Sequence, residues 1–260
     1  MQNDNWGRRA RFGIFIVGAE AVPEAEWWAM APAGVSIHAA RVTAKAPWAT
    51  WNEDRSAVTL SADLQRGAEQ FASLALSAVV VAHSSSSVVG GEGWDAATVA
   101  ALSSHLSSDT RITTNGSDCV AALRHLGVQR PFLVFPPWFT EAPIAAGITY
   151  FQTLGFDVAG HHRNQPEERW QGIAPQDLYA HQMHVAQDVT ALHEQIVETC
   201  PTDADGILIV GTGLRCVAII EQLEAALGRP VVTANQASLW RCMTLSNVQA
   251  SIQGYGRLLR

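Results

Sequence analysis

The sequence predicts an α/β fold in which helices cover both faces of a parallel sheet, and three observations support this prediction. Short apolar runs rich in Val and Ile alternate with longer stretches of helical period. Two of the predicted helices stop at glycine, in Leu126-Gly127 and Leu227-Gly228, where a left-handed residue is favoured. At 260 residues, 48% of them hydrophobic, the chain can bury a sizeable core in one large domain or two small ones.

The predicted elements follow from these two periods, taken in chain order. Short apolar runs bounded by small or polar residues predict strands at Phe12–Val17, Val35–Val42, Ala78–His83, Phe132–Phe135, Phe156–Ala159, Gly206–Val210 and Val231–Thr233. Apolar residues spaced by a helical turn predict helices at Ala62–Ala75, Asp95–Leu106, Ser117–Leu126, Glu141–Leu154, Gln176–Glu198 and Leu214–Leu227. Two polar segments are expected to be surface excursions, too short for separate domains: Thr43–Arg55 and Arg163–Gly172.

The charge balance argues against nucleic acid as a partner. The sequence has 17 Lys and Arg residues and 24 Asp and Glu residues, which gives a net charge of -7. It contains no run of basic residues of the kind that binds along a phosphate backbone. The longest apolar stretches, such as Ala78–Ala82 with its neighbours, are far shorter than the ~20 residues of a membrane-spanning helix. Met1–Arg11 is polar and lacks a signal-peptide core. We therefore expect a cytoplasmic protein that binds neither nucleic acid nor membrane.

Cysteine and histidine spacing gives no indication of a metal site. The four cysteines are widely spaced and form no CxxC pair, so we expect buried thiols rather than a disulfide framework or a zinc site: Cys119, Cys200, Cys216 and Cys242. The histidines at 161, 162, 181 and 184 lack acidic partners at ligand spacing, which favours a solvated helix face over a metal site.

Two loops of small residues follow predicted strands. In outline, the same order of elements leads to each loop: a strand, a crossover and a second strand. The loops are Ser84–Ser87 and Gly211–Gly213, and each is followed by a helix. Because ligands of open parallel sheets bind beyond the carboxyl ends of the strands, we expect the chemistry at these two loops.

The first loop combines His83 with four hydroxyls, those of Ser84, Ser85, Ser86 and Ser87. Hydroxyls and backbone N–H groups at a strand end can hold a carboxylate or an oxyanion. An imidazole there can give or take a proton near neutral pH. A flexible polar turn and a hydrogen-bonded core histidine are the alternative interpretations.

The second loop is Gly211-Thr212-Gly213, between a strand and a helix. Its glycines allow the backbone to approach a ligand closely. Cys216 stands where the third glycine of a GxGxxG fingerprint would be, so nucleotide binding is rejected. The serine run lacks flanking glycines, which disfavours a hydrolase with a Gly-x-Ser-x-Gly elbow.

Among the tryptophans, Trp138 is the one expected near a ligand. It follows Pro136-Pro137 at the end of a predicted strand. The other tryptophans are assigned to the core or to pocket walls, and no paired-carboxylate motif stands out.

Several segments together resemble the aspartate/glutamate racemase superfamily, within it the branch of arylmalonate decarboxylases and maleate isomerases. The resemblance extends over nearly the whole chain, and its most specific part is the long block from Gly211 to Trp240. The segments are Met30–His38, Ala82–Gly91, Gly211–Glu224, Gly228–Ala237 with Leu239-Trp240, and Gly254–Leu258.

The resemblance implies two pseudo-symmetric Rossmann-like (flavodoxin-like) halves with parallel sheets, the active site between them, and no metal or organic cofactor. The halves would be residues 1–114 plus 231–260, and residues 115–230. Racemases and isomerases of this kind place one cysteine in each loop, and the decarboxylases keep only the second. Here His83 and Gly211 stand at those two positions, so both thiols are replaced.

The replacement restricts the mechanism that the resemblance implies. A two-base racemase and a thiolate-adding isomerase both need groups that these loops lack. The leading hypothesis is a cofactor-free lyase or isomerase acting on a small carboxylic or carbonyl acid, with His83 as acid and base. The serines, Thr212 and the loop amides would hold the developing anion, with Asn115 and Ser117 as additions.

Two alternatives remain open from the sequence. One is a hydrolase or ring-opening enzyme in which His83 activates water or a serine. The other is a binding protein that has lost catalysis and senses a small acid. The sequence also leaves open the substrate, the association of identical subunits into a homo-oligomer, and a role for Cys216 or for Glu20, Glu24 or Glu26 after the first strand.

Overall fold

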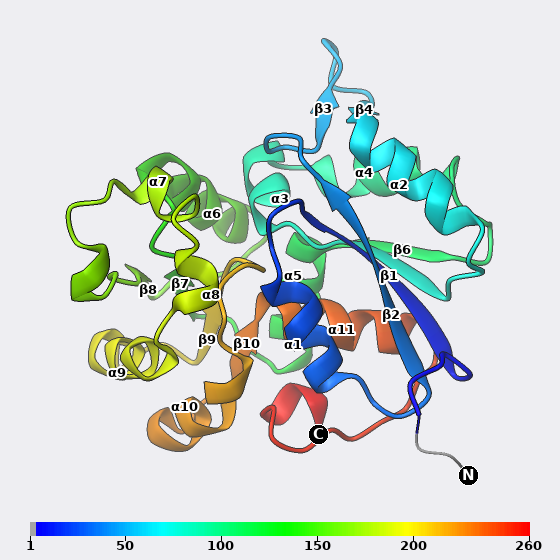
Figure 1. Ribbon diagram of the computed structural model, residues 1–260. Helices are drawn as coiled ribbons and strands as arrows, with labels where there is room; N and C mark the ends of the chain where they lie inside the picture. The colour runs from blue at the N-terminus through cyan, green and yellow to red at the C-terminus, as the bar shows by residue number, and fades with distance from the viewer. Residues whose placement is uncertain (1–3) are drawn as a thin grey trace.

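The computed structural model describes residues 4–260, so residues 1–3 of the polar N-terminal segment lie outside the described part. It contains two parallel four-stranded sheets and a small antiparallel hairpin (Figure 1). The first sheet has the order β2-β1-β5-β6, formed by β1 (Ala10–Val17), β2 (Val35–Val42), β5 (Ala78–Val81) and β6 (Arg111–Thr114). The second has the order β10-β9-β7-β8, formed by β7 (Pro131–Phe135), β8 (Gly160–Arg163), β9 (Gly206–Ile209) and β10 (Val231–Thr233). The hairpin pairs β3 (Ala49–Trp51) with β4 (Val58–Leu60).

The two sheets have the same topology, which confirms the predicted α/β fold of two halves. The order of the second sheet becomes that of the first when β7 replaces β1, β8 replaces β2, β9 replaces β5 and β10 replaces β6. The loops after β1 and β7 are therefore equivalent, and so are the loops after β5 and β9.

Helices connect the strands and cover the sheets. They are α1 (Val22–Met30), α2 (Ala62–Ala72), α3 (Ser84–Gly90), α4 (Trp94–Ser103), α5 (Asn115–His125), α6 (Glu141–Thr153), α7 (Pro175–Leu178), α8 (Met183–Ala186), α9 (Val189–Thr199), α10 (Ile220–Leu227) and α11 (Ala234–Leu245). Short 3-10 turns lie at Glu168–Trp170, Val217–Ile219 and Arg257–Leu259. Among residues 4–260, no helix is both long and apolar enough to span a membrane.

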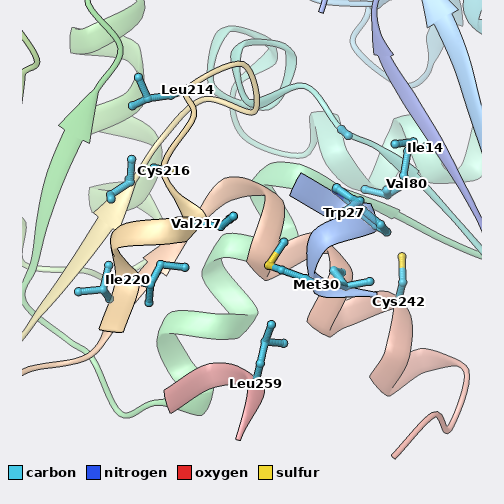
Figure 2. Close-up of a cluster of buried hydrophobic side chains, with 14 of the residues drawn as sticks. Ile14, Trp27, Met30, Val80, Leu214, Cys216, Val217, Ile220, Cys242 and Leu259 are labelled. Carbon is cyan, nitrogen blue, oxygen red and sulfur yellow. The ribbon is translucent and has the colours of Figure 1, made fainter. Parts of the chain in front are cut away.

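Alternate residues of the central strands point into different cores, as the two-residue period of a strand requires. In β1, Ile14 and Ile16 enter a cluster that also receives Val134 of β7 and Ile207 of β9, whereas Phe15 points to the opposite face. Figure 2 shows part of this shared cluster, where side chains of α1, α10 and α11 meet those of β1 and β5. The two halves are therefore joined by one continuous core.

α5 and α11 pack against each other, and each also covers the other half's sheet. α5 follows β6 of the first sheet but contacts β9 and β10 of the second. α11 follows β10 of the second sheet but contacts β5 and β6 of the first, together with α1. One helix from each half therefore packs on the sheet of the other half.

Predicted elements in three regions of the chain differ from the structure. The segment Phe156–Ala159 is not a strand, because Gly155 has a φ of +92° and Phe156 turns back to pack on Phe151, so β8 begins only at Gly160. The single helix predicted over Gln176–Glu198 is three helices, α7, α8 and α9. It is interrupted at Gln182, which has a left-handed φ of 62°.

The third difference lies in the predicted site. Ser84–Ser87 does not form a loop but the first turn of α3. The helix predicted from Leu214 begins, as an α-helix, only at Ile220. The division of the chain into residues 1–114 plus 231–260 and residues 115–230 stays a prediction. Of the C-terminal segment assigned to the first half, Val231–Thr233 pairs with β9 of the second sheet, while α11 packs on the first sheet.

Candidate functional site

The carboxyl ends of β1, β5, β7 and β9 surround a cavity of about 190 Å³. Its lining comes from the loops after these four strands and from the turn between α7 and α8: Val17, Glu20, His83, Ser84, Ser85, Trp138, Phe139, Tyr179, Gly211, Thr212 and Gly213. Parallel strands in both sheets direct their carboxyl ends here, which is where ligands of such sheets bind. The structure brings the two predicted loops together at this cavity.

His83 lies between β5 and α3 and faces the cavity with a neutral ring. Its Nδ1 is 2.8 Å from the Ser86 Oγ, and its ring stacks on Trp48 at a centroid distance of 4.1 Å. The Ser86 Oγ accepts the Trp48 backbone N–H at 2.9 Å, and among the described residues its own hydrogen has no acceptor other than Nδ1, so we assign that hydrogen to Nδ1 and the ring proton to Nε2. Burial lowers the pKa of His83 to about 3. At neutral pH this histidine is therefore an uncharged hydrogen-bond donor.

The four serines point in different directions because successive residues of a helix are rotated by about 100°. Ser84 and Ser85 line the cavity, whereas Ser86 and Ser87 turn away from it. Ser87 donates to Asp95 at 2.7 Å. Among residues 4–260 the Ser85 hydroxyl has no hydrogen-bond partner, so it is the serine that remains available to a ligand.

Ser84 joins the two loops directly. Its Oγ accepts the Gly211 N–H at 3.2 Å and donates to the Asn115 Oδ1 at 2.6 Å. Asn115 does not line the cavity; its amide donates to the Ala234 carbonyl at 2.8 Å and to the Ser238 Oγ at 2.9 Å. The predicted contribution of Asn115 to the site is therefore indirect, through the position of Ser84.

Ser117 lies apart from the cavity. Its hydroxyl donates to the Thr114 carbonyl at 2.9 Å, and its side chain lines a separate groove of about 760 Å³ along α4, α5 and α6. This groove is the larger of the two hollows, but it contains none of the strand-end loops. We place the candidate site in the smaller cavity because the predicted chemistry converges there.

The loop after β9 is built from glycines for steric reasons. Gly211 has a φ of +97°, and a Cβ there would lie 2.5 Å from the Pro136 Cγ. A Cβ on Gly213 would lie 2.4 Å from the Glu20 Oε1. Between them, the Thr212 Oγ1 lies 3.1 Å from the Ala82 carbonyl and 3.4 Å from the Glu20 Oε2.

Glu20 is a cavity residue whose role the sequence analysis left open. Its side chain lines the cavity while the residue is only 5% exposed. Burial raises the pKa of its carboxyl to about 7, and the opposing effects of the neighbouring Tyr179 and Thr212 hydroxyls and of the Arg41 charge are smaller. Its position after the first strand was the only sequence signal, shared with Glu24 and Glu26.

The other groups left open lie outside the cavity. Glu24 forms an ion pair with Arg41. Glu26 accepts the backbone N–H groups of Cys216 and Val217 at 2.6 and 3.0 Å and so fixes the turn after the second loop. The Cys216 thiol is buried, and burial raises its pKa well above the ordinary value. Neither glutamate nor this cysteine reaches the candidate site.

Aromatic side chains form the remaining wall. Trp138 and Phe139 follow β7 and line the cavity, as does Tyr179. Tyr179 packs edge-on against Trp138 at 5.6 Å and stacks on His184 at 4.4 Å. Among the described residues, no His, Cys, Asp or Glu side chains are grouped as a metal site would require.

Comparison with known proteins identifies a family and similar folds. The family model described as arylmalonate decarboxylase matches residues 58–259. No curated protein sequence matches the chain. Among solved structures, the maleate isomerase Iso of Pseudomonas putida S16 is similar, with a TM-score of 0.78, 18% identity and coverage of 96% of this chain and 98% of that one.

Two further structures share the fold. The maleate cis-trans isomerase of Nocardia farcinica has a TM-score of 0.76 and 17% identity, with coverage of 96% of this chain and 98% of that one. An arylmalonate decarboxylase has a TM-score of 0.72 and 20% identity with the same coverage. At these identities the structures show the fold alone.

Proposed function

Because the chain belongs to the arylmalonate decarboxylase family, we propose that it is a cofactor-independent decarboxylase or isomerase acting on a small carboxylic or carbonyl acid. The observation that carries the proposal is the meeting of the two predicted loops at one cavity, where the Gly211 N–H reaches the Ser84 Oγ at 3.2 Å. A cavity of about 190 Å³ suits a small acid.

In this proposal the cavity stabilises an enediolate or another oxyanion. The Ser85 hydroxyl and the Nε2–H of His83 are hydrogen-bond donors that need no rearrangement as negative charge develops on the substrate. A neutral imidazole can stabilise an oxyanion in this way without giving up its proton. The apolar wall of Trp138 and Phe139 would receive the group beside the reacting carbon and keep water away from a departing carboxylate.

The test is a panel of small acids incubated with the purified protein in D₂O and followed by proton NMR. The panel contains phenylmalonate, maleate and simple 3-oxo acids, with no metal or cofactor added. We expect one member to lose carbon dioxide or to isomerise, with solvent deuterium at the carbon beside the acid group. Uptake of labelled oxygen from solvent would instead indicate hydrolysis, and binding without turnover would indicate a sensor.

His83 is tested on the same substrate. The sequence analysis assigns it proton transfer, and its neutral ring supports a second role, the donation of a hydrogen bond to the anion. Both roles predict that a folded His83→Ala variant loses turnover by about a hundredfold or more. Unchanged turnover would remove His83 from the reaction.

A further inference from the structure

Glu20 is the one carboxyl group among the described residues that line the cavity, and none of these residues carries a cation. Its Oε2 lies 3.4 Å from the Thr212 Oγ1, and its Oε1 occupies the space left by the absent side chain of Gly213. The carboxyl therefore reaches across from the first half of the molecule to the second loop. It lies in the same cavity as His83 and Ser85.

The groups around Glu20 determine its charge. Tyr179 approaches its carboxyl from the segment between α7 and α8, and His184 stacks on Tyr179. Arg41 of β2 donates to the Glu20 backbone carbonyl at 2.8 Å, but its second nitrogen is paired with Glu24. The lowered pKa of His184 and of His83 leaves both rings uncharged at neutral pH. Burial consequently outweighs the Arg41 charge and raises the Glu20 pKa to about 7.

An ionised Glu20 would oppose the binding of an acid. A carboxylate ligand in this small cavity would face the Glu20 carboxylate, and no cation in the lining offsets the repulsion. Two carboxylates that share such a site do not both ionise readily. A protonated Glu20 removes the repulsion and adds a hydrogen-bond donor to the cavity.

We propose that Glu20 is the catalytic proton donor of this site and that an acid with a single carboxylate binds to the form in which Glu20 is protonated. This inference rests on the proposed function and deepens it. It assigns proton transfer to Glu20 and leaves to His83 the stabilisation of the anion.

The reaction that needs a donor in the resting site is decarboxylation. The bond between the carboxylate carbon and the neighbouring carbon breaks, carbon dioxide leaves, and the electron pair remains as an enolate on the carbon and the adjacent carbonyl oxygen. The proton moves from Glu20 to that carbon and leaves a Glu20 carboxylate. Water then returns a proton to Glu20, so each turnover consumes one proton from solvent. The substrate class is a 3-oxo acid or another acid with one carboxylate next to an electron-withdrawing group.

The protonation of Glu20 is tested without any ligand. Protein labelled with carbon-13 in the glutamate carboxyl groups is titrated by NMR, and the Glu20 signal is identified by its loss in Glu20→Gln. We expect this signal to titrate near neutral pH, since the pKa of Glu20 is raised to about 7. Glu24→Gln, which removes a carboxyl group four positions along the chain, in α1 and outside the cavity, keeps the signal. Titration of Glu20 in the ordinary range of a carboxyl overturns the proposal.

Binding is tested with phenylacetate by titration calorimetry. We expect the wild-type affinity to be about tenfold weaker at about pH 8 than at about pH 6, with one proton taken up per ligand at the higher pH. Glu20→Gln is expected to bind with the same affinity at both values and to take up no proton. Maleate, which carries two carboxylates, is expected to bind more weakly than phenylacetate.

Turnover separates this inference from the proposed function. On the acid that the wild-type enzyme converts, Glu20→Gln is expected to lose about a hundredfold or more in kcat while it retains phenylacetate binding, with partial recovery in Glu20→Asp. Unchanged kcat in Glu20→Gln, or wild-type binding that does not depend on pH, overturns the role of Glu20 and leaves the proposed function standing. If the wild-type enzyme neither binds nor converts any acid, the proposed function itself fails.

Discussion

β1 and β5 of the first sheet occupy the same places as β7 and β9 of the second, yet the loops after them bring different groups to the cavity. The first pair supplies titratable and hydroxyl side chains: Glu20, His83 and Ser85. The second pair supplies an aromatic wall and a glycine loop whose shape depends on its backbone: Trp138, Phe139 and Gly211–Gly213. Equal topology therefore does not imply equal chemistry, and side chains in the two halves should respond differently to substitution.

The largest expected effect concerns the first half of the molecule, and it measures how much the ionisation of buried Glu20 lowers the unfolding free energy. The folded-state pKa of Glu20 is raised above its usual value, so its favourable contribution to stability is fully present below about pH 4.5 and is lost as pH rises through about 7. Glu20→Gln avoids this loss. The quantity compared is the unfolding free energy of the variant minus that of the wild type. We expect this difference to be about 3 kcal/mol larger at about pH 8 than at about pH 4.

Urea unfolding of both proteins at the two pH values measures this difference. Other buried groups titrate identically in wild type and variant, so the difference isolates Glu20. Equal stability changes in the two proteins would show that Glu20 ionises freely, and the contrast between the halves would lose its main support.

The next effect concerns the second half of the molecule, where the glycine loop after β9 depends on its backbone conformation. Gly211→Ala combines a strained φ of +97° with a Cβ that would lie 2.5 Å from the Pro136 Cγ, and we expect a loss of about 2 kcal/mol in unfolding free energy. Gly172→Ala is the matched control, because its φ is +85° but its Cβ would meet nothing within 4 Å. It should lose only about 1 kcal/mol. Equal losses in the two variants would show that the loop tolerates a side chain.

A smaller effect tests the bond that joins the halves. Ser84→Ala removes the acceptor of the Gly211 N–H and the donor to Asn115, both of which are buried. We expect a loss of about 1.5 kcal/mol in thermal or urea unfolding. A variant as stable as wild type would mean that other contacts hold the two loops together.

The smallest effect on stability is expected for Ser85. Ser85→Ala removes a hydroxyl that has no partner among the described residues, so stability should change by less than about 0.5 kcal/mol. Phenylacetate binding should weaken by about fivefold, because one donor to the ligand is lost. Unchanged binding would exclude this hydroxyl from the anion site.

Much of the fold follows from local sequence patterns. The boundaries of Val35–Val42 and Val231–Thr233 are predicted correctly, although both are edge strands, because Val and Ile recur along the first and the second is the β-branched run Val-Val-Thr. β6 was missed, since the polar Arg111–Thr114 has no such run. α3 was missed because serine favours turns and caps, whereas packing on neighbouring helices and the hydrogen bonds of Ser84, Ser86 and Ser87 hold this segment in a helix.

The candidate site could be predicted from the sequence, but its side chains could not be assigned their directions or charges. The loops were identified because both end parallel strands, yet the direction of each serine depends on a helix that the sequence did not predict. The charge of Glu20 depends on its burial in the fold and on neighbours such as Tyr179, which is far away in the chain. No local sequence pattern around Glu20 indicates that contact, so the sequence alone does not distinguish Glu20 from Glu24 and Glu26.

The exchange of α5 and α11 between the halves has a consequence for assembly. Exchange of a terminal element is how two copies of one chain form a domain-swapped dimer, and here it occurs within a single chain. A chain cut between Leu126 and Pro131 would yield two fragments, each carrying the helix that covers the other's sheet. Neither fragment should fold alone, and the cavity should re-form only when the two are mixed, so that activity would report directly on fragment complementation.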